Sequence, residues 1–241
     1  MDAVTRRTDY AIKESIRAIR ERIAEAADRS GRSSTEVTLI GVTKTVGVPE
    51  MREMIRNGVT HIGENRAQEI VSKYPQLTDD GLCWHMIGTM QKNKVRHIAD
   101  KVNLIQSVDG VSLAMEIDKA GKRLNKRVPV LVEVNIAGEE TKGGVKPEDA
   151  AELVKRIAEL SNVEARGLMT IAPYTGDPQN LRRYFQRMRE LFVDIKDYYD
   201  NVVDTDVFGV LSMGMTNDYA VAVEEGSTMV RIGTGIFGER L

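Results

Sequence analysis

Apolar residues in the first part of the chain recur at spacings of three and four, with Arg and Glu residues between them. Side chains at these spacings share one face of a helix, so the pattern predicts one amphipathic helix over residues 1–30. The polar, glycine-containing stretch at 28–34 predicts where this helix ends. The residues that mark the apolar face are Ile12, Ile16, Ile19 and Ile23.

After this helix the pattern of apolar residues changes: short apolar runs alternate with charged segments that have the helical period. This alternation is typical of βα units and of a parallel sheet. The eight candidate strands are Val37–Thr43, Val59–Gly63, Trp84–Gly88, Leu104–Ser107, Val130–Ile136, Ala165–Ile171, Val207–Leu211 and Thr228–Gly233.

Helical segments between these runs carry initiation signals such as an early proline or an early acid. The repeat length predicts an α/β fold, a (β/α)8 TIM barrel with an extra N-terminal helix. The chain would form a single domain over 1–241, with the helix of 1–30 packed on the barrel. A doubly wound open sheet is the alternative, since a count of elements does not distinguish it from a closed barrel. The helices are predicted to begin near Pro49, Asn65, Gln91, Pro147, Pro178 and Asp218.

Composition narrows the class of protein. Of 241 residues, 41% are hydrophobic, and 34 Lys and Arg against 36 Asp and Glu give a net charge of −2. This balance excludes a disordered chain and offers no general electrostatic footprint for nucleic acid or an anionic membrane. The single cysteine, Cys83, excludes an internal disulfide and fits a reducing compartment. With no apolar run long enough to span a bilayer, we expect a cytoplasmic protein, and a monomer since no long apolar surface stripe remains.

Candidate chemistry lies where the strands end, because barrel enzymes carry their reactive groups there. Lys44 closes the apolar run LIGVTK. A desolvated lysine at this place would have a lowered pKa and a neutral amine for Schiff-base chemistry. The alternative is a lysine that extends to the surface from the strand end.

The stretch TMVRIGTG is the next candidate. If the residues on either side of Arg231 face the helices, Met229 and Arg231 face the barrel interior, where a buried arginine needs an acceptor. The turn from Gly233 through Thr234 to Gly235, followed by a short helix at Ile236–Arg240, predicts a phosphate site. The alternative is a glycine-rich corner without a ligand.

Other polar residues carry weaker signals. Ser212 and Thr216 lie in a second glycine turn, LSMGMTND, where Thr216 is expected to cap the following helix. Asn65, in the sequence GEN, is a cap or a pocket residue. The three histidines, His85 among them, form no metal-binding pattern.

Several stretches occur together in the order found in one family: GVTKTV, GENRAQE, WHMIGTMQKNK, NIAGEETKGG, RGLMTIAP and LSMGMTNDYAVAVEEGSTMVRIGTGIFGER. In these motifs the chain resembles the pyridoxal phosphate homeostasis protein (YggS/PROSC) family over nearly its whole length. The resemblance implies a barrel like the N-terminal domain of alanine racemase that holds pyridoxal 5′-phosphate (PLP). Departures are Met90 and Thr216, where the family commonly has leucine and serine, and GTG, where a bulkier residue often follows the threonine.

The resemblance also implies roles for individual residues. Lys44 would hold PLP as a Schiff base, and Arg231 would face the pyridine nitrogen. Ser212, Gly233 and Thr234 would hold the phosphate, while Asn65 and His85 would line the pocket. The family is described as binding PLP in intracellular homeostasis without an established turnover.

Physical chemistry is consistent with a carrier. An arginine cannot accept the ring-nitrogen proton that a strong PLP electron sink requires, and we expect the barrel to use nearly all of the 241 residues, without a second domain. PLP-requiring apo-enzymes would then be the partners that receive the cofactor. Two alternatives stay open: a PLP-dependent, racemase-like enzyme of narrow activity, or a PLP-free Schiff-base aldolase.

Overall fold

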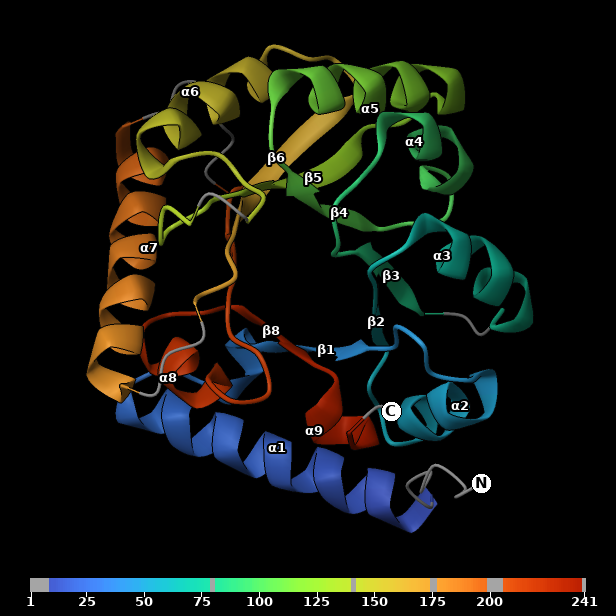
Figure 1. The fold of residues 1–241 in the computed structure, drawn as a ribbon, viewed down its shortest axis with the longest axis vertical. Helices are drawn as coiled ribbons and strands as arrows, with labels where there is room; N and C mark the ends of the chain where they lie inside the picture. The colour runs from blue at the N-terminus through green and yellow to red at the C-terminus, as the bar shows by residue number, and fades with distance from the viewer. Residues whose placement is uncertain (1–8, 79–80, 140–141, 174–176, 199–205, 240–241) are drawn as a thin grey trace.

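A computed structural model describes residues 9–78, 81–139, 142–173, 177–198 and 206–239. Its eight strands run parallel and close into a barrel in sequence order, since β1 pairs with both β2 and β8 (Figure 1). The predicted TIM barrel is therefore confirmed, and the open-sheet alternative is wrong. The strands are β1 (Thr38–Val42), β2 (His61–Glu64), β3 (Cys83–Met86), β4 (Leu104–Val108), β5 (Val128–Glu133), β6 (Val163–Met169), β7 (Val210–Ser212) and β8 (Met229–Ile232).

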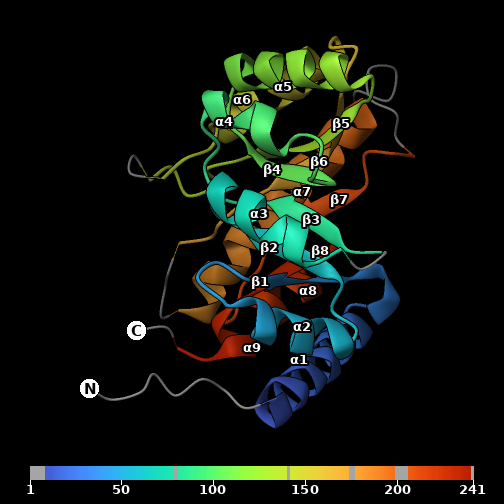
Figure 2. The same ribbon diagram turned by 90° about the vertical axis from the view of Figure 1, so that its right-hand side faces the viewer.

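Helices lie outside the barrel and follow the strands in turn, as α2 to α5 do along one side of the molecule (Figure 2). None of those described is both long and apolar enough to cross a membrane. They are α1 (Asp9–Arg29), α2 (Val48–Arg56), α3 (Ala67–Lys73), α4 (Lys92–Ile98), α5 (Val111–Leu124), α6 (Pro147–Ala158), α7 (Pro178–Tyr198), α8 (Tyr219–Glu224) and α9 (Thr234–Phe237), with the 3-10 turns η1 (Ser34–Glu36) and η2 (Tyr74–Gln76).

Two helices differ from the sequence prediction. Helix α5 was not predicted, because it begins after Gly110 with neither a proline nor an acid in its first turn. Helix α9 begins two residues earlier than the predicted short helix at Ile236–Arg240, and Arg240 lies outside the described residues. The six predicted helix starts fall within two residues of observed helices.

Helix α1 crosses the outside of the barrel and packs against α2, α8 and α9 (Figure 1). The predicted apolar face is the buried one: Ile12 is 1% exposed and Ile23 is 4% exposed. Burying each such side chain stabilises the fold by about 1.5–3 kcal/mol, so α1 is held by its isoleucine stripe. Residues 1–8 of the predicted helix lie outside the described part of the chain.

Side chains of the strands alternate between two buried layers, as the period of two requires. Val230 and Ile232 of β8 belong to the core between the strands and the helices. Met229 faces the barrel interior, where it packs in a small apolar cluster, and the remaining inward positions are mostly polar. The interior cluster consists of Ile40, Leu104, Leu131, Met169 and Met229.

Candidate functional site

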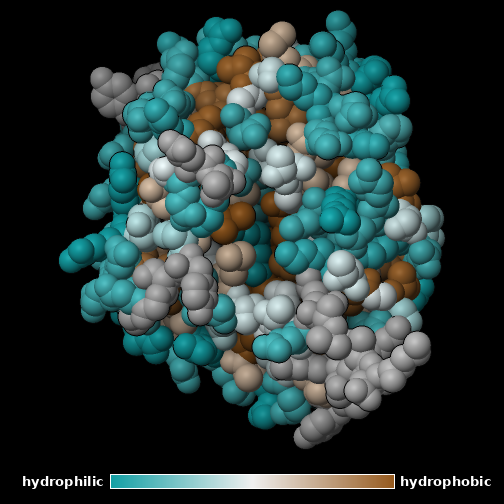
Figure 3. Space-filling model, viewed as in Figure 1, coloured by the Kyte–Doolittle hydropathy of each residue, from teal (hydrophilic) through white to brown (hydrophobic). Residues whose placement is uncertain are grey.

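A pocket of about 230 Å³ opens among the carboxyl ends of the strands. The face seen in Figures 1 and 3 carries the loops that follow the strands, and the space-filling view shows it hollowed near its centre. Residues that follow β1 and β6, the β7–α8 turn and the end of β8 form the walls. The lining residues are Val42, Lys44, Ala172, Met215, Thr216, Asn217, Asp218, Arg231, Gly233 and Thr234.

Lys44 lies two residues beyond the end of β1, in a turn at the pocket edge. Its side chain is exposed and has no hydrogen-bond or ion-pair partner within the described residues. The expectation of a desolvated lysine is therefore wrong, because β1 ends at Val42 and the turn carries Lys44 out of the apolar interior. The alternative, a lysine that reaches solvent from the strand end, is what the structure shows.

The turn that carries Lys44 is held from outside the barrel by a buried cluster of charges. Lys73 of α3 donates hydrogen bonds to Thr43 O at 2.8 Å, Glu64 Oε1 at 2.8 Å and Glu69 Oε2 at 2.7 Å. The Thr43 hydroxyl also donates to Glu64 Oε1, at 2.6 Å. Thr45, whose φ of 60° is uncommon for a residue other than glycine, donates its N–H to Glu69 Oε2 at 2.8 Å. The backbone on both sides of Lys44 is thereby fixed.

Burial acts on the two carboxyl groups of this cluster in different ways. Glu64 is fully buried, and its desolvation raises its pKa despite the hydrogen bonds from Lys73 and Thr43. Desolvation also opposes ionisation of Glu69, but hydrogen bonds from Lys73 and from the Thr45 N–H outweigh it and lower the pKa of Glu69. The second oxygen of Glu64, Oε2, is buried without a hydrogen-bond partner among the described residues.

Arg231 points into the barrel, as the alternation in β8 predicts, and is 4% exposed. The hydrogen-bond acceptors of its guanidinium come from β7 and from the residue after β6. Arg231 Nη1 donates to Ser212 Oγ at 2.6 Å, and Nη2 donates to Thr170 O at 2.8 Å. Burial lowers its pKa to about 10, which the charges of Asp218 and Glu133 oppose. Arg231 is therefore a fixed cation at neutral pH.

The glycine turn after β8 is tied to the turn after β7. The hydroxyl of Thr216 accepts hydrogen bonds from Gly235 N at 3.2 Å and from the Thr234 hydroxyl at 3.1 Å. The expectation that Thr216 caps α8 is wrong, because Asp218 is the N-cap residue of that helix and accepts a hydrogen bond from Met215 N. Thr216 instead orients the turn that opens α9.

Three predicted site residues do not line this pocket. Ser212 is fully buried below Arg231, and His85, 2% exposed, lies inside the barrel. Asn65 is half-buried after β2. Its backbone packs so closely on Gly88 that a Cβ on residue 88 would lie 2.5 Å from Asn65 O. Asn65 does not cap α3, since the N-cap residue is Arg66. The pocket thus brings together Lys44, Arg231, Gly233 and Thr234.

Two acidic residues near Arg231 were not predicted as site residues. Desolvation, followed by the charge of Asp109, raises the pKa of Glu133 to about 7, and Arg231 opposes this shift. Burial also raises the pKa of Asp218, which lines the pocket. The sequence did contain a signal for Glu133, because the Val residues on either side of it face the helices and leave it pointing inward.

Comparisons with known proteins agree with one another. Residues 15–241 match the model of the family described as alanine racemase, N-terminal domain. A pyridoxal phosphate homeostasis protein of Aquifex aeolicus is 46% identical over 227 residues, which cover 94% of this chain and 97% of the relative. PipY of Synechococcus elongatus is 30% identical; its structure with PLP bound has a TM-score of 0.81 and covers 94% of this chain and 100% of PipY.

The fold extends to more distant proteins. The structure of alanine racemase from Corynebacterium glutamicum has a TM-score of 0.65 at 13% identity, and the match covers 91% of this chain and 60% of the racemase. At this identity the likeness concerns the fold alone.

Proposed function

The chain belongs to the family of the alanine racemase N-terminal domain and, within it, to the pyridoxal phosphate homeostasis proteins, and on that premise we propose that it binds PLP and acts in PLP homeostasis. One observation supports this proposal more than any other. A free primary amine on Lys44, a buried guanidinium on Arg231 and the backbone turn at Gly233 line a single pocket. These groups suit an aldehyde, a ring nitrogen and a phosphate, respectively.

PLP supplies an aldehyde that condenses with a lysine amine to a Schiff base, with loss of one water. Lys44 is the residue we assign to this linkage, and the charge cluster around Glu64 and Lys73 holds its backbone. The turn at Gly233 and Thr234 would receive the phosphate. The turn depends on glycine at 235, since a Cβ there would lie 2.7 Å from Ile232 Cγ2.

We assign Arg231 to the ring nitrogen, and this assignment favours a carrier over a catalyst. Arg231 is cationic at neutral pH and donates both of its described hydrogen bonds into the protein. A guanidinium cannot accept the proton of a pyridinium, and its charge disfavours a second positive charge beside it. Racemisation of alanine by the purified protein at rates typical of enzymes would contradict this part of the proposal.

The test is an absorbance spectrum of the protein with PLP, before and after borohydride, followed by peptide mapping of the reduced protein. We expect a visible band that borohydride removes and a modification on Lys44. Lys44→Ala should lose the band, while Lys92→Ala, a change at an exposed lysine of α4, should keep it. Modification of a different lysine, or none after incubation with PLP, would refute the proposal.

The cellular role carries three further expectations: a cytoplasmic location, a monomer, and delivery of PLP to apo-enzymes that require it. A single cysteine is consistent with a reducing compartment. Delivery is tested by mixing PLP-loaded protein with a PLP-free enzyme and comparing its reactivation with that produced by free PLP at the same concentration. Light scattering on the same sample measures the molar mass.

A further inference from the structure

The interior of the barrel contains an unbroken series of hydrogen bonds between side chains of five strands. It starts at Arg231, whose Nη1 lies 2.6 Å from Ser212 Oγ. Ser212 Oγ lies 2.7 Å from Gln106 Oε1, and Gln106 Nε2 lies 3.1 Å from His85 Nδ1. The last link joins His85 Nε2 to His61 Nδ1 at 2.9 Å. We call this series the interior relay.

The chemistry of the first donor sets the direction of the whole relay. A guanidinium only donates, so Ser212 accepts from Arg231 and gives its one proton to the Gln106 carbonyl oxygen. The Gln106 amide nitrogen then donates to His85 Nδ1, which must carry no proton. His85 is therefore the Nε2–H tautomer and donates to His61.

Burial holds His85 in this neutral form. Desolvation, with the neighbouring His61 adding to it, lowers the pKa of His85 to about 3. A protonated His85 would also place an N–H against the amide N–H of Gln106. The opposite amide orientation of Gln106 would leave the Ser212 proton without this acceptor, so the network itself selects the orientation.

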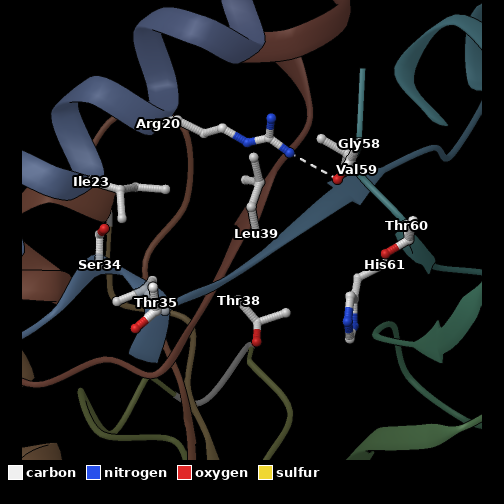
Figure 4. Close-up of a pocket in the computed structure, with 11 residues that line it drawn as sticks. Arg20, Ile23, Ser34, Thr35, Thr38, Leu39, Gly58, Val59, Thr60 and His61 are labelled. Carbon is white, nitrogen blue, oxygen red and sulfur yellow. Dashed lines mark hydrogen bonds between the residues drawn. The ribbon is translucent and has the colours of Figure 1, made fainter. Parts of the chain in front are cut away.

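The two ends of the relay lie at opposite mouths of the barrel. Arg231 lines the pocket that contains Lys44. His61 lines a second pocket of about 340 Å³ at the amino-terminal ends of the strands, shown in Figure 4. There Arg20 of α1 donates to Gly58 O at 2.8 Å, and the hydroxyls of Thr38 and Thr60 contribute to the wall.

Few charged groups face His61. The imidazole of His85 faces His61 from β3, and Arg20 of α1 faces the pocket that His61 lines. The described lining of that pocket includes no carboxylate. Desolvation lowers the pKa of His61 and so favours its neutral form. The Nε2–H of His85 then requires that His61 Nδ1 carry no proton.

We propose that Gln106 and His85 are positioning residues that fix the Ser212 hydroxyl and the Arg231 guanidinium, and that His61 anchors them from the opposite mouth of the barrel. In the carrier function proposed above, on which this inference rests for its ligand, the relay keeps Arg231 in one orientation toward the cofactor. Without the amide of Gln106, the Ser212 proton loses its acceptor and His85 loses the donor that selects its tautomer. Loss of the Gln106 amide should therefore disturb both Arg231 and His61, the two ends of the interior relay.

The first test uses nitrogen-15 NMR of the protein without PLP, in which only three histidines contribute. We expect His85 to show the neutral Nε2–H pattern without titrating over about pH 5 to 8. Gln106→Leu should convert it to a mixture of tautomers and should increase the exchange of the Arg231 guanidinium protons. A His85 that titrates in this range, or that carries its proton on Nδ1, would overturn the relay.

The second test measures PLP affinity by absorbance titration. Gln106→Leu should weaken binding by about tenfold, the loss that accompanies removal of a buried hydrogen bond linked to a charged group. His61→Phe, remote from the cofactor pocket, should weaken it by about threefold, since one buried donor is left without its acceptor. His97→Ala, at an exposed histidine of α4, is the control and should bind as the wild type does.

The outcomes separate the two proposals. Unchanged affinity in both relay variants would overturn the positioning role even if the tautomer of His85 is as expected. Failure of the wild-type protein to bind PLP would instead refute the proposed function. In that case the tautomer and the exchange of the Arg231 protons would still decide whether Gln106 and His85 position Arg231.

Discussion

Replacing Lys73 with methionine should be one of the most destabilising single changes near the site. The ammonium group of Lys73 is the cation shared by Glu64 and Glu69, at 2.8 and 2.7 Å, and it also holds Thr43 O. Methionine fills a similar volume but makes none of these bonds. Two carboxylates then face each other without a cation, one of them fully buried.

The magnitude follows from the burial of the pair. Removing one partner of a buried ion pair costs about 3–5 kcal/mol, because the remaining charge stays desolvated. For a chain of this size, each kcal/mol lowers Tm by about 2–4 °C, which gives a fall of about 6–20 °C. This is a large share of a typical total stability of about 5–15 kcal/mol.

The assay is urea unfolding followed by circular dichroism, for the wild type, Lys73→Met and the double variant with Glu64→Leu. Because the double variant also removes the buried carboxylate of Glu64, it should recover most of the free energy of unfolding that Lys73→Met loses. Lys119→Ala breaks an exposed pair with Glu116 and serves as the control, with an expected loss below about 1 kcal/mol.

Acid should partly rescue Lys73→Met. Burial already raises the pKa of Glu64, and loss of the cation raises it further. A carboxyl with a raised folded pKa destabilises the protein as pH rises through that value, so the deficit should shrink as pH falls from neutral toward the ordinary pKa of glutamate. A loss below about 1 kcal/mol at neutral pH, or a double variant as unstable as the single one, would show that the buried carboxylate of Glu64 does not depend on the Lys73 cation.

Three further predictions concern the mouth of the barrel. Burial raises the pKa of Glu133 in the folded protein to about 7, so its ionisation lowers the free energy of unfolding as pH rises through that value. Glu133→Gln should therefore be more stable than the wild type at pH 8 but not at pH 5, and equal differences in the free energy of unfolding at both pH values would contradict this. Thr216→Val removes the acceptor for Gly235 N and should weaken PLP binding about threefold to tenfold in a titration, while unchanged affinity would argue against a role for the turn. Gly214→Ala should lower Tm in a thermal melt, because φ is +95° and the new Cβ would lie 2.6 Å from Ala222 Cβ; an unchanged Tm would show that the turn can rearrange.

The architecture could be predicted from the chain alone because it depends on local patterns. A period of two in the strands, a period near three and a half in the helices and their regular alternation are enough to specify βα units. Among the described helices, α5 was not predicted, since neither a proline nor an acid marks its first turn.

The site was only partly predictable, for reasons that individual residues make clear. The strand-end rule found Lys44 and Arg231, and alternation placed Arg231 inward. The same rule grouped Asn65, His85 and Ser212 with them, although the structure sets these three away from the lining of the pocket. The position of a residue along a strand predicts which face of the sheet its side chain lies on and how close it lies to the mouth of the barrel. It does not predict which residue across the barrel will be its hydrogen-bond partner.

The amino-acid sequence was enough to specify the alternation of strands and helices, the family, and the carboxyl ends of the strands as the location of the chemistry. Closure of the sheet into a barrel became evident only from the pairing of β1 with β8. The pairing of the polar groups, in contrast, depends on the three-dimensional fold. The folded chain exposes Lys44, gives Arg231 acceptors from β7 and from the residue after β6, and links His85 of β3 to Gln106 of the neighbouring strand β4. The physical reason is that hydrogen bonds and desolvation depend on distances between residues far apart in the chain, which close only when the barrel does.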